Sequence, residues 1–278
     1  MDLFSHWNLR ERPFEATWDT RFFFPSREHE EALNRLCFLA TEQTMNMGLL
    51  TGEIGSGKTL TQTVFAERLD PERFEVLVQE NSNFGFKDLL GGVLAALEQT
   101  APRLHETTYM RCQHFRRAIE QLHARGRHLV LIFDEAQEMS DRTLSDLKLL
   151  TNYNGHGQAL LTLILVGQPE LRQRVARLPA INQRISLRFH LHRLTAMEST
   201  AAYLRHRLRT AGHPNGDVFL PEAIHRAFEA SAGIPRELNR LAKLSLELAW
   251  LRDLPQIPAP VVDGVVRDLE RQQTLCAA

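Results

Sequence analysis

At residues 52–59 the chain reads Gly52-Glu53-Ile54-Gly55-Ser56-Gly57-Lys58-Thr59. This stretch matches the pattern G-x-x-x-x-G-K-[ST] in full. Its glycines allow backbone N–H groups to turn inward around a phosphate without clashes from Cβ atoms. We therefore expect Lys58 to reach the β- and γ-phosphates of ATP and the Thr59 hydroxyl to hold Mg²⁺. Leu60, the next residue, completes the predicted ATP-binding set.

The surroundings of this loop are those that a phosphate-binding loop requires. Residues 47–51 read as a strand, and residues 58–69 read as a helix whose positive amino-terminal end would point at the same anion. The alternative is a glycine-rich turn that binds no ligand. A complete pattern between a strand and a helix favours nucleotide binding.

A second motif follows the apolar run at residues 129–133, which ends in Asp134 and Glu135. A buried strand that ends in two carboxylates places them at the carboxyl edge of a sheet, where α/β proteins bind ligands. We expect Asp134 to hold the Mg²⁺ shell and Glu135 to polarise the attacking water. The alternative is that the pair caps a helix. Beside a complete phosphate loop, the pair favours nucleotide hydrolysis.

Strands and helices alternate between residues 26 and 194. Strands are predicted at 47–51, 74–78, 128–133, 159–166 and 186–191, and helices after Ser26 and at 58–69, 86–98, 110–124 and 142–150. This alternation predicts an α/β fold with a doubly wound parallel sheet and helices on both faces. Helices are then predicted at 196–209, 221–231, 236–251 and 260–272. We expect a P-loop ATPase domain at 26–194 and a small all-helical lid domain at 195–278.

The first 25 residues form an aromatic arm broken by prolines. It contains Trp7, Phe14, Trp18 and the run Phe22-Phe23-Phe24. We expect this arm to pack across the outside of the main domain. The alternative is a docking surface for a partner, because exposed aromatic side chains mark interfaces.

The composition is that of an ordinary globular protein, with 43% hydrophobic and 24% charged residues among 278. A net charge of −1 argues against a uniformly basic nucleic-acid binder, although a local basic face is compatible with it. Three widely spaced cysteines fit a reducing cytoplasm. We expect neither a signal peptide nor a membrane span, because no apolar run approaches about 20 residues.

Several segments together resemble the ExeA-type (general secretion pathway protein A) AAA+ ATPases. They are Trp7-Asn8-Leu9 with Pro13-Phe14, the loop at 52–59, Asp134-Glu135-Ala136-Gln137, the run Leu147–Asn152, and Val166-Gly167-Gln168-Pro169-Glu170-Leu171. The resemblance extends to about Arg240. It implies a P-loop AAA+ fold with strand order 5-1-4-3-2. Related ATPases that select targets in bacterial DNA transposition share much of this pattern.

The resemblance implies further catalytic residues. Gln168 corresponds to sensor 1, which reads the γ-phosphate, and its alternative is an ordinary strand-end turn. Arg184, in Asn182-Gln183-Arg184-Ile185, corresponds to the arginine finger that acts on a neighbouring subunit's nucleotide. Arg188 is a rival for that role, and either arginine could be a simple surface residue. Arg236, in Gly233-Ile234-Pro235-Arg236, corresponds to sensor 2, and its alternative is a helix-start arginine.

The implied function is an ATP hydrolase that uses ATP and Mg²⁺, assembles into a homo-oligomer and drives or switches a larger machine. The resemblance favours secretion or pilus assembly with a partner protein. The alternative is an ATP-gated adaptor that binds duplex DNA without sequence preference and serves a transposase. A third class is a nucleotide-dependent switch that barely hydrolyses ATP.

One charge feature bears on these alternatives. Residues 172–209 contain nine arginines and a single acidic residue, Glu198. This stretch is either a solvated face that carries the finger or a surface that follows DNA phosphates in the ATP state.

Overall fold

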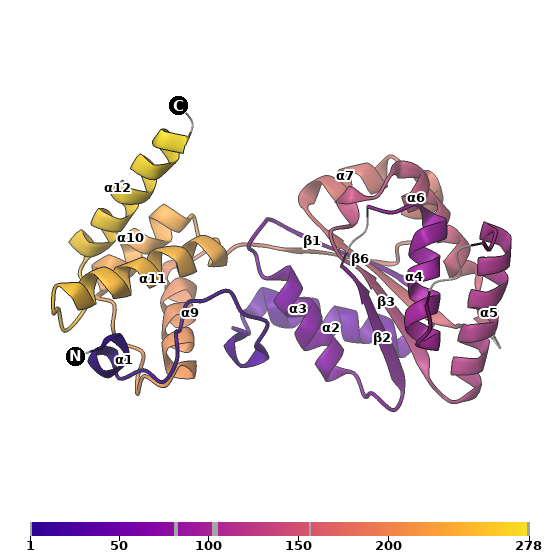
Figure 1. Cartoon of the computed structure of the whole chain (residues 1–278), viewed down its shortest axis with the longest axis horizontal. Coiled ribbons are helices and arrows are strands. Elements are labelled where there is room, and N and C mark those ends of the chain that lie inside the picture. Colours follow the sequence, from indigo (N-terminus) through magenta and orange to yellow (C-terminus); the bar gives the residue numbers. More distant parts are fainter. Residues whose placement is uncertain (1, 81–82, 102–104, 156, 277–278) are drawn as a thin grey trace. The chain divides into compact units, whose positions relative to one another are not determined.

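A computed structural model describes residues 2–80, 83–101, 105–155 and 157–276 (Figure 1). Contacts divide the chain into two compact units. The helical unit comprises Met1–Arg27, Gly55–Leu60 and His192–Ala278, and the sheet unit comprises Glu28–Ile54 and Thr61–Leu191.

The sheet unit contains a five-stranded sheet in which every neighbouring pair is parallel. The strands are β1 (Met47–Gly52), β2 (Phe74–Gln79), β3 (His128–Phe133), β6 (Leu161–Gly167) and β7 (Leu187–Leu191). Their order is β2-β3-β6-β1-β7, which confirms the predicted 5-1-4-3-2 arrangement when the strands are counted along the chain. The central strands β1, β3 and β6 are buried along their whole length, as their unbroken apolar runs predict.

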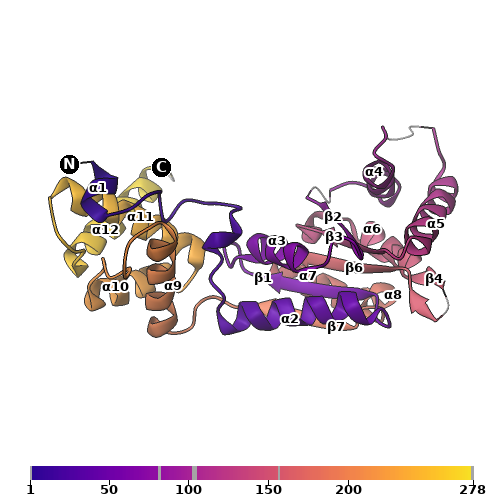
Figure 2. The ribbon, with the colours of Figure 1, turned by 90° about the horizontal axis from the view of Figure 1, so that it is seen from below.

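Helices cover both faces of this sheet. Alternate strand residues, among them Leu49, Leu131 and Leu163, share a core with α4 (Phe86–Glu98), α5 (Thr108–Ala124), α6 (Asp141–Asp146), α7 (Pro169–Ala176) and α8 (Pro179–Asn182). On the other face Gly48 lies against Leu39 of α2 (Arg27–Glu42), where a Cβ atom would approach the leucine side chain to 2.6 Å. Figure 2 shows α2 alongside β1. The predicted α/β class is confirmed.

Two of the predicted elements differ in kind from the structure. The helix predicted at 142–150 ends at Asp146 and continues as the 3-10 helix η3 (Leu147–Asn152), in which Leu147 and Leu150 are buried. The strand predicted at 159–166 begins at Leu161, because residues 158–159 pair instead in a short hairpin of β4 (Asn154–Gly155) and β5 (Gln158–Ala159). The 3-10 turn η2 (Ala136–Glu138) and helices α7 and α8 were not predicted.

The helical unit contains α9 (Met197–Thr210), α10 (Pro221–Ser231), α11 (Pro235–Leu251), α12 (Ala259–Cys276) and the short α1 (Leu3–Trp7). Both α10 and α11 begin with proline, whose fixed φ suits the first helical turn and whose missing N–H is not needed there. None of the helices in the described residues has the length and hydropathy needed to cross a bilayer.

The aromatic arm belongs to the core of this helical unit, whereas we expected it to pack across the outside of the main domain. Trp7, Phe14 and Phe22 are buried among α9–α12, and the Trp7 indole N–H donates to the Leu246 carbonyl at 3.2 Å. The buried Arg207 guanidinium donates to the Pro13 carbonyl at 2.6 Å. The sequence pattern predicts that these aromatic side chains are buried, but it does not indicate which helices or strands they pack against.

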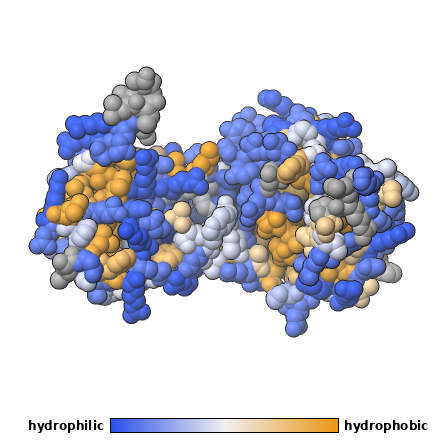
Figure 3. Space-filling view, viewed as in Figure 1, coloured by the Kyte–Doolittle hydropathy of each residue, from blue (hydrophilic) through white to orange (hydrophobic). Residues whose placement is uncertain are grey.

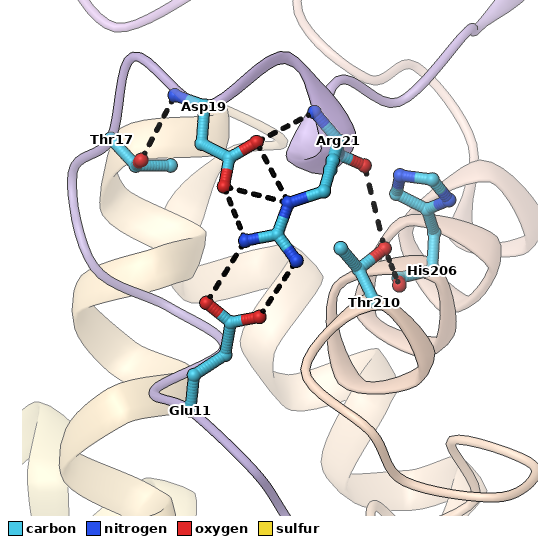
Figure 4. A network of polar contacts seen from close by, with 6 residues as sticks. All are labelled: Glu11, Thr17, Asp19, Arg21, His206 and Thr210. Carbon is cyan, nitrogen blue, oxygen red and sulfur yellow. Dashed lines mark hydrogen bonds and ion pairs between the residues drawn. The ribbon is translucent and has the colours of Figure 1, made fainter.

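Polar contacts on the outside of the arm are shown in Figure 4. Within the arm, Arg21 Nη1 lies 3.1 Å from Glu11 Oε1, and its Nε donates to Asp19 Oδ2 at 2.9 Å. The Thr210 hydroxyl on α9 lies 3.5 Å from the Arg21 carbonyl oxygen. Exposed ion pairs of this kind contribute little to stability, because solvent screens the two charges. Apolar burial therefore holds the arm in place more than these charges do.

Both units also expose some apolar surface, visible as orange patches among blue in Figure 3. Among the described residues the most exposed large apolar side chains are Trp18 in the arm, Tyr109 on α5 and Leu251 at the end of α11. If the arm docks a partner, the exposed aromatic side chains available for the contact are Trp18, which is 67% exposed, and Phe4, which is 37% exposed.

Candidate nucleotide site

The glycine loop connects β1 to α3 (Lys58–Arg68). Gly55 has a φ of 82° and Gly57 a φ of 98°, in the left-handed region that favours glycine. A Cβ atom on Gly55 would lie 2.5 Å from the Arg236 Cβ atom, so this position has no room for a side chain. Lys58 is 7% exposed and begins α3. These glycines, an ammonium group and a helix start are the donor set that phosphates require, so the residues fit ATP.

Arg236 lies beside this loop. Its backbone N–H donates to the Gly55 carbonyl oxygen at 3.3 Å, while its side chain is exposed. The turn before it depends on Gly233, which has a φ of 73° and whose added Cβ would lie 2.0 Å from the Leu194 carbonyl oxygen. Arg236 is also the second residue of α11, so both the sensor 2 role and the helix-start alternative stay predictions.

Asp134 and Glu135 follow β3 directly. Asp134 is 7% exposed, and its Oδ1 accepts the Glu135 N–H at 2.8 Å. Glu135 has a φ of 47°, a left-handed conformation that is unfavourable for a side chain of this type. Glu135 occupies the N-cap position of η2 but makes no side-chain capping hydrogen bond. Helix capping by Glu135, the alternative to a functional carboxylate, therefore loses its support.

The strand register brings three predicted positions to one edge of the sheet. Thr51 pairs with Gly167, and Phe133 pairs with Leu165, so the residues that follow β1, β6 and β3 leave the same edge. Neighbouring strands lie about 4.8 Å apart. Gly52, Gln168 and Asp134 therefore stand at adjacent strand ends, and the glycine loop starts from this edge.

Sequence reasoning did not assign Gln137, which joins two predicted catalytic residues. Its Nε2 donates to Glu135 Oε2 at 2.5 Å, and its Oε1 accepts the Gln168 N–H at 3.0 Å. Gln168 Nε2 lies 3.5 Å from the same Glu135 oxygen. The structure thus brings Glu135 and Gln168 together. The only signal for Gln137 was its place in the D-E-A-Q block.

Arg184 lies at the opposite edge of the sheet. Its Nη1 donates to the Thr151 hydroxyl at 3.3 Å, and nearby Ser186 donates its N–H to the Met47 carbonyl, at the first residue of β1. The six residues of β1 separate the two edges by about 16 Å. Arg184 is therefore not brought to its own chain's carboxylates. The rival Arg188 donates to the Asn182 carbonyl at 2.8 Å.

The arginine-rich stretch is divided between the two units at residues 191–192, and several of its arginines are engaged within their own unit. Arg207 is 3% exposed, and the Arg174 guanidinium donates to the Gln137 and Met139 carbonyls. Arg205 pairs with Asp217 at 2.7 Å. A charge count along the sequence overstates the number of arginines available to a partner.

Comparisons with known proteins agree with this architecture. A family model described as an AAA domain matches residues 41–175. General secretion pathway protein A from Aeromonas hydrophila is 31% identical over 246 residues, which cover 88% of this chain and 44% of that protein. The chain thus spans less than half the length of this relative.

Solved structures share the fold at low sequence identity. The Aeropyrum pernix ORC2 protein in its ADPNP–ADP complexes matches with a TM-score of 0.68 and 13% identity, over 93% of this chain and 71% of that chain. The Aeropyrum pernix ORC1 protein in complex with DNA matches with a TM-score of 0.66 and 15% identity, over 92% of this chain and 72% of that chain. At this identity the solved structures show the fold alone. With the glycine loop, the paired carboxylates and the strand order, the AAA-domain match and the 31% identity show that the chain belongs to the P-loop AAA proteins of the general secretion pathway protein A (ExeA) type.

Proposed function

We propose that this chain binds ATP with Mg²⁺ and hydrolyses it, and that it works as a homo-oligomer that drives or switches a larger assembly. One observation carries the proposal. The glycine loop, the two carboxylates and Gln168 all follow neighbouring parallel strands at one sheet edge. This is the edge at which α/β proteins bind ligands. We assign the ATPase domain to residues 26–194 and the lid to residues 195–278.

Binding rests on Gly52–Leu60, with Lys58 compensating the charge of the phosphates. Thr59 and Asp134 would hold Mg²⁺, because a hydroxyl and a carboxylate are the oxygen ligands that this ion accepts beside phosphate. The bound ion would offset charge on the phosphate oxygens. Arg236 would add a second positive charge, since its backbone already contacts the loop at Gly55.

Hydrolysis rests on Glu135, which would orient the attacking water and accept its proton. Gln168 would contact the γ-phosphate from the end of β6. Its amide lies 3.5 Å from the Glu135 carboxylate, so one residue could report the phosphate state to the other.

Arg184 would serve a neighbouring subunit. Its position at the amino edge of the sheet, about 16 Å along β1 from its own loop, is incompatible with action on its own nucleotide. The same position suits a residue that completes a site across an interface. Arg188 is the weaker candidate, because its guanidinium makes two short hydrogen bonds to Asn182, at 2.8 and 2.7 Å, whereas Arg184 makes one longer bond, to Thr151 at 3.3 Å.

For the wider role we favour a protein-partner ATPase of the secretion type, acting in the cytoplasm. The similarity to general secretion pathway protein A supports this choice, and the sparse cysteines fit the compartment. The alternative is an ATP-gated adaptor that binds duplex DNA for a transposase. The engagement of Arg174, Arg205 and Arg207 within their own units weakens it.

Two variants test nucleotide binding and turnover. Lys58→Ala should abolish ATP binding, and Glu135→Gln should keep ATP bound while turnover is lost, because an amide cannot accept the water proton. Lys87→Ala and Glu138→Gln are matched controls away from the predicted contacts. Binding of a fluorescent ATP analogue and phosphate release are the measurements. A Glu135→Gln variant that hydrolyses ATP at the parental rate would refute the catalytic assignment.

DNA binding by the Glu135→Gln variant separates the two wider roles. The DNA-adaptor role requires binding with ATP but not with ADP, and a steep fall in affinity with salt. We expect no such nucleotide-dependent binding at low salt. If it is found, the secretion-type role gives way to the adaptor.

A further inference from the structure

The proposed function leaves Gln137 without a role, although its amide touches both residues that would carry hydrolysis. The side chain extends from η2, directly after β3, to the first turn of α7, directly after β6. One end contacts the Glu135 carboxylate and the other contacts the Gln168 backbone. We propose that Gln137 is the positioning residue of this site, which aims the Glu135 carboxylate and ties it to the sensor end of β6.

The chemistry of the two contacts requires an amide at position 137. An ionised carboxylate only accepts hydrogen bonds, and a backbone N–H only donates. A side chain that bridges them must donate at one end and accept at the other. The two contacts also fix the amide orientation, since the opposite one would place two acceptors together at Glu135 and two donors together at Gln168. Asparagine is one methylene shorter and would not span both partners.

The surroundings leave space for this amide and hold its backbone. A Cβ atom on Gly167 would lie 2.5 Å from Gln137 Oε1, so a residue with a side chain there would displace the bridge. Behind it, Arg174 Nη1 donates to the Gln137 carbonyl at 2.5 Å and Nη2 donates to the Met139 carbonyl at 2.6 Å. Arg174 also pairs with Asp141. The turn that carries Gln137 is thus held against α7 from its other side.

The bridge has a direct consequence for catalysis. Both amides, from Gln137 and Gln168, meet the Oε2 atom of Glu135. The carboxylate is therefore held by one oxygen, and Oε1 is the oxygen presented to a water. A shift of Gln168 on reading the γ-phosphate would move the same bridge. The inference rests on the proposed ATP hydrolysis, because a positioned base matters only if turnover occurs.

Removing the amide at constant volume tests the positioning role. Gln137→Met should lower kcat by about 10- to 100-fold, the range typical of partners that orient a functional ligand. The KM for ATP and the affinity for an ATP analogue should stay within about twofold of the parental values, because the contacts that bind ATP in the ground state are unchanged. Glu138→Ala, in the same turn, should keep the parental kcat and KM.

A second variant distinguishes positioning from a structural role. Gln137→Glu keeps the length of the side chain, but its carboxylate has no donor for Glu135 and repels it. The kcat of this variant should fall at least as far as that of Gln137→Met, while its KM for ATP should stay within about twofold of the parental value.

The outcomes separate the two proposals. If the parental chain hydrolyses ATP and Lys58→Ala does not, but Gln137→Met has the parental kcat, the positioning role is overturned while the ATPase proposal stands. A parental kcat for Gln137→Glu overturns it as well, even if Gln137→Met is too unstable to assay. If the parental chain shows no turnover that depends on Lys58, both proposals are overturned.

Discussion

His128 is a buried histidine whose protonation should destabilise the fold. It is 2% exposed at the start of β3, its Nε2 lies 2.9 Å from the Thr162 hydroxyl, and its Nδ1 has no hydrogen-bond partner among the described residues. Burial lowers the pKa of His128 from 6.5 to about 4, and the nearby His123 acts in the same direction. The folded state therefore binds this proton more weakly than the unfolded state does.

The sign and size of the effect follow from linkage. Above about pH 6.5 the ring is neutral in both states and carries no penalty. As pH falls from 6.5 toward 4, His128 takes up a proton in the unfolded state but stays neutral in the folded state, and the free energy of unfolding decreases. At about 1.4 kcal/mol per pKa unit, the loss reaches about 2 kcal/mol at pH 5 and about 3 kcal/mol once pH is below both values.

Urea unfolding at pH 7.5 and pH 5 measures this loss. The free energy of unfolding of His128→Gln should fall by about 2 kcal/mol less than that of the parental chain over this interval. His225→Gln, which removes an exposed histidine, should follow the parental pH dependence. Equal pH dependence in the parental chain and His128→Gln would refute the assignment of a suppressed pKa to this burial.

Three further predictions concern the loop, the interface and the arm. Gly55→Ala combines a left-handed φ with a Cβ 2.5 Å from the Arg236 Cβ, so ATP affinity should fall at least about 5-fold, whereas Gly126→Ala, strained but in open space, should bind ATP normally. Arg184→Ala should keep ATP affinity but lose about 10³-fold in turnover. Mixing Arg184→Ala subunits with Lys58→Ala subunits should restore part of the activity. If only a mixture of Arg188→Ala with Lys58→Ala is rescued, Arg188 is the finger. Arg207→Met should destabilise the chain by at least about 2 kcal/mol in urea and speed tryptic cleavage in the arm, while Arg205→Met, which breaks an exposed pair, should do neither.

The sheet was predictable because its information is local. Each buried strand is a continuous apolar run bounded by turn residues, so β3 begins and ends at the predicted residues 128 and 133. The 3-10 helix after Asp146 was not predicted, because it depends on distant partners. The Asn46 side-chain amide donates to the Thr151 carbonyl at 2.7 Å, across 105 residues of chain. Such a contact leaves no periodic signal near Thr151.

The candidate site likewise contains residues that local sequence predicts and a contact that it does not predict. Lys58, Thr59, Asp134 and Glu135 stand in two short motifs whose chemistry is readable from spacing alone. The bridge from Gln137 to Gln168 crosses 31 residues and exists only because β3 and β6 are neighbours. The strand order that makes them neighbours came from family resemblance and not from periodicity. Without that order, Gln137 reads as a polar residue in a turn.

The arginine-rich stretch shows why charge along a sequence differs from charge on a surface. Arg207 is buried against the arm, and its guanidinium donates to the Pro13 and Glu15 carbonyls. Burial lowers the pKa of Arg207. Its charge is therefore not available to a partner. Arg209 donates to the Asn215 carbonyl, and Arg174 braces the turn that carries Gln137. The exposed arginines of this stretch are Arg172, Arg177, Arg184 and Arg188 in the sheet unit and Arg193 and Arg209 in the helical unit. Since each phosphate contact contributes about −0.9 to the logarithmic salt slope, these residues would give one subunit a slope near −5 at most, against about −8 for all nine arginines. A slope steeper than about −5 would therefore have to come from several subunits acting together, and assembly would then be a precondition of such DNA binding and not a consequence of it.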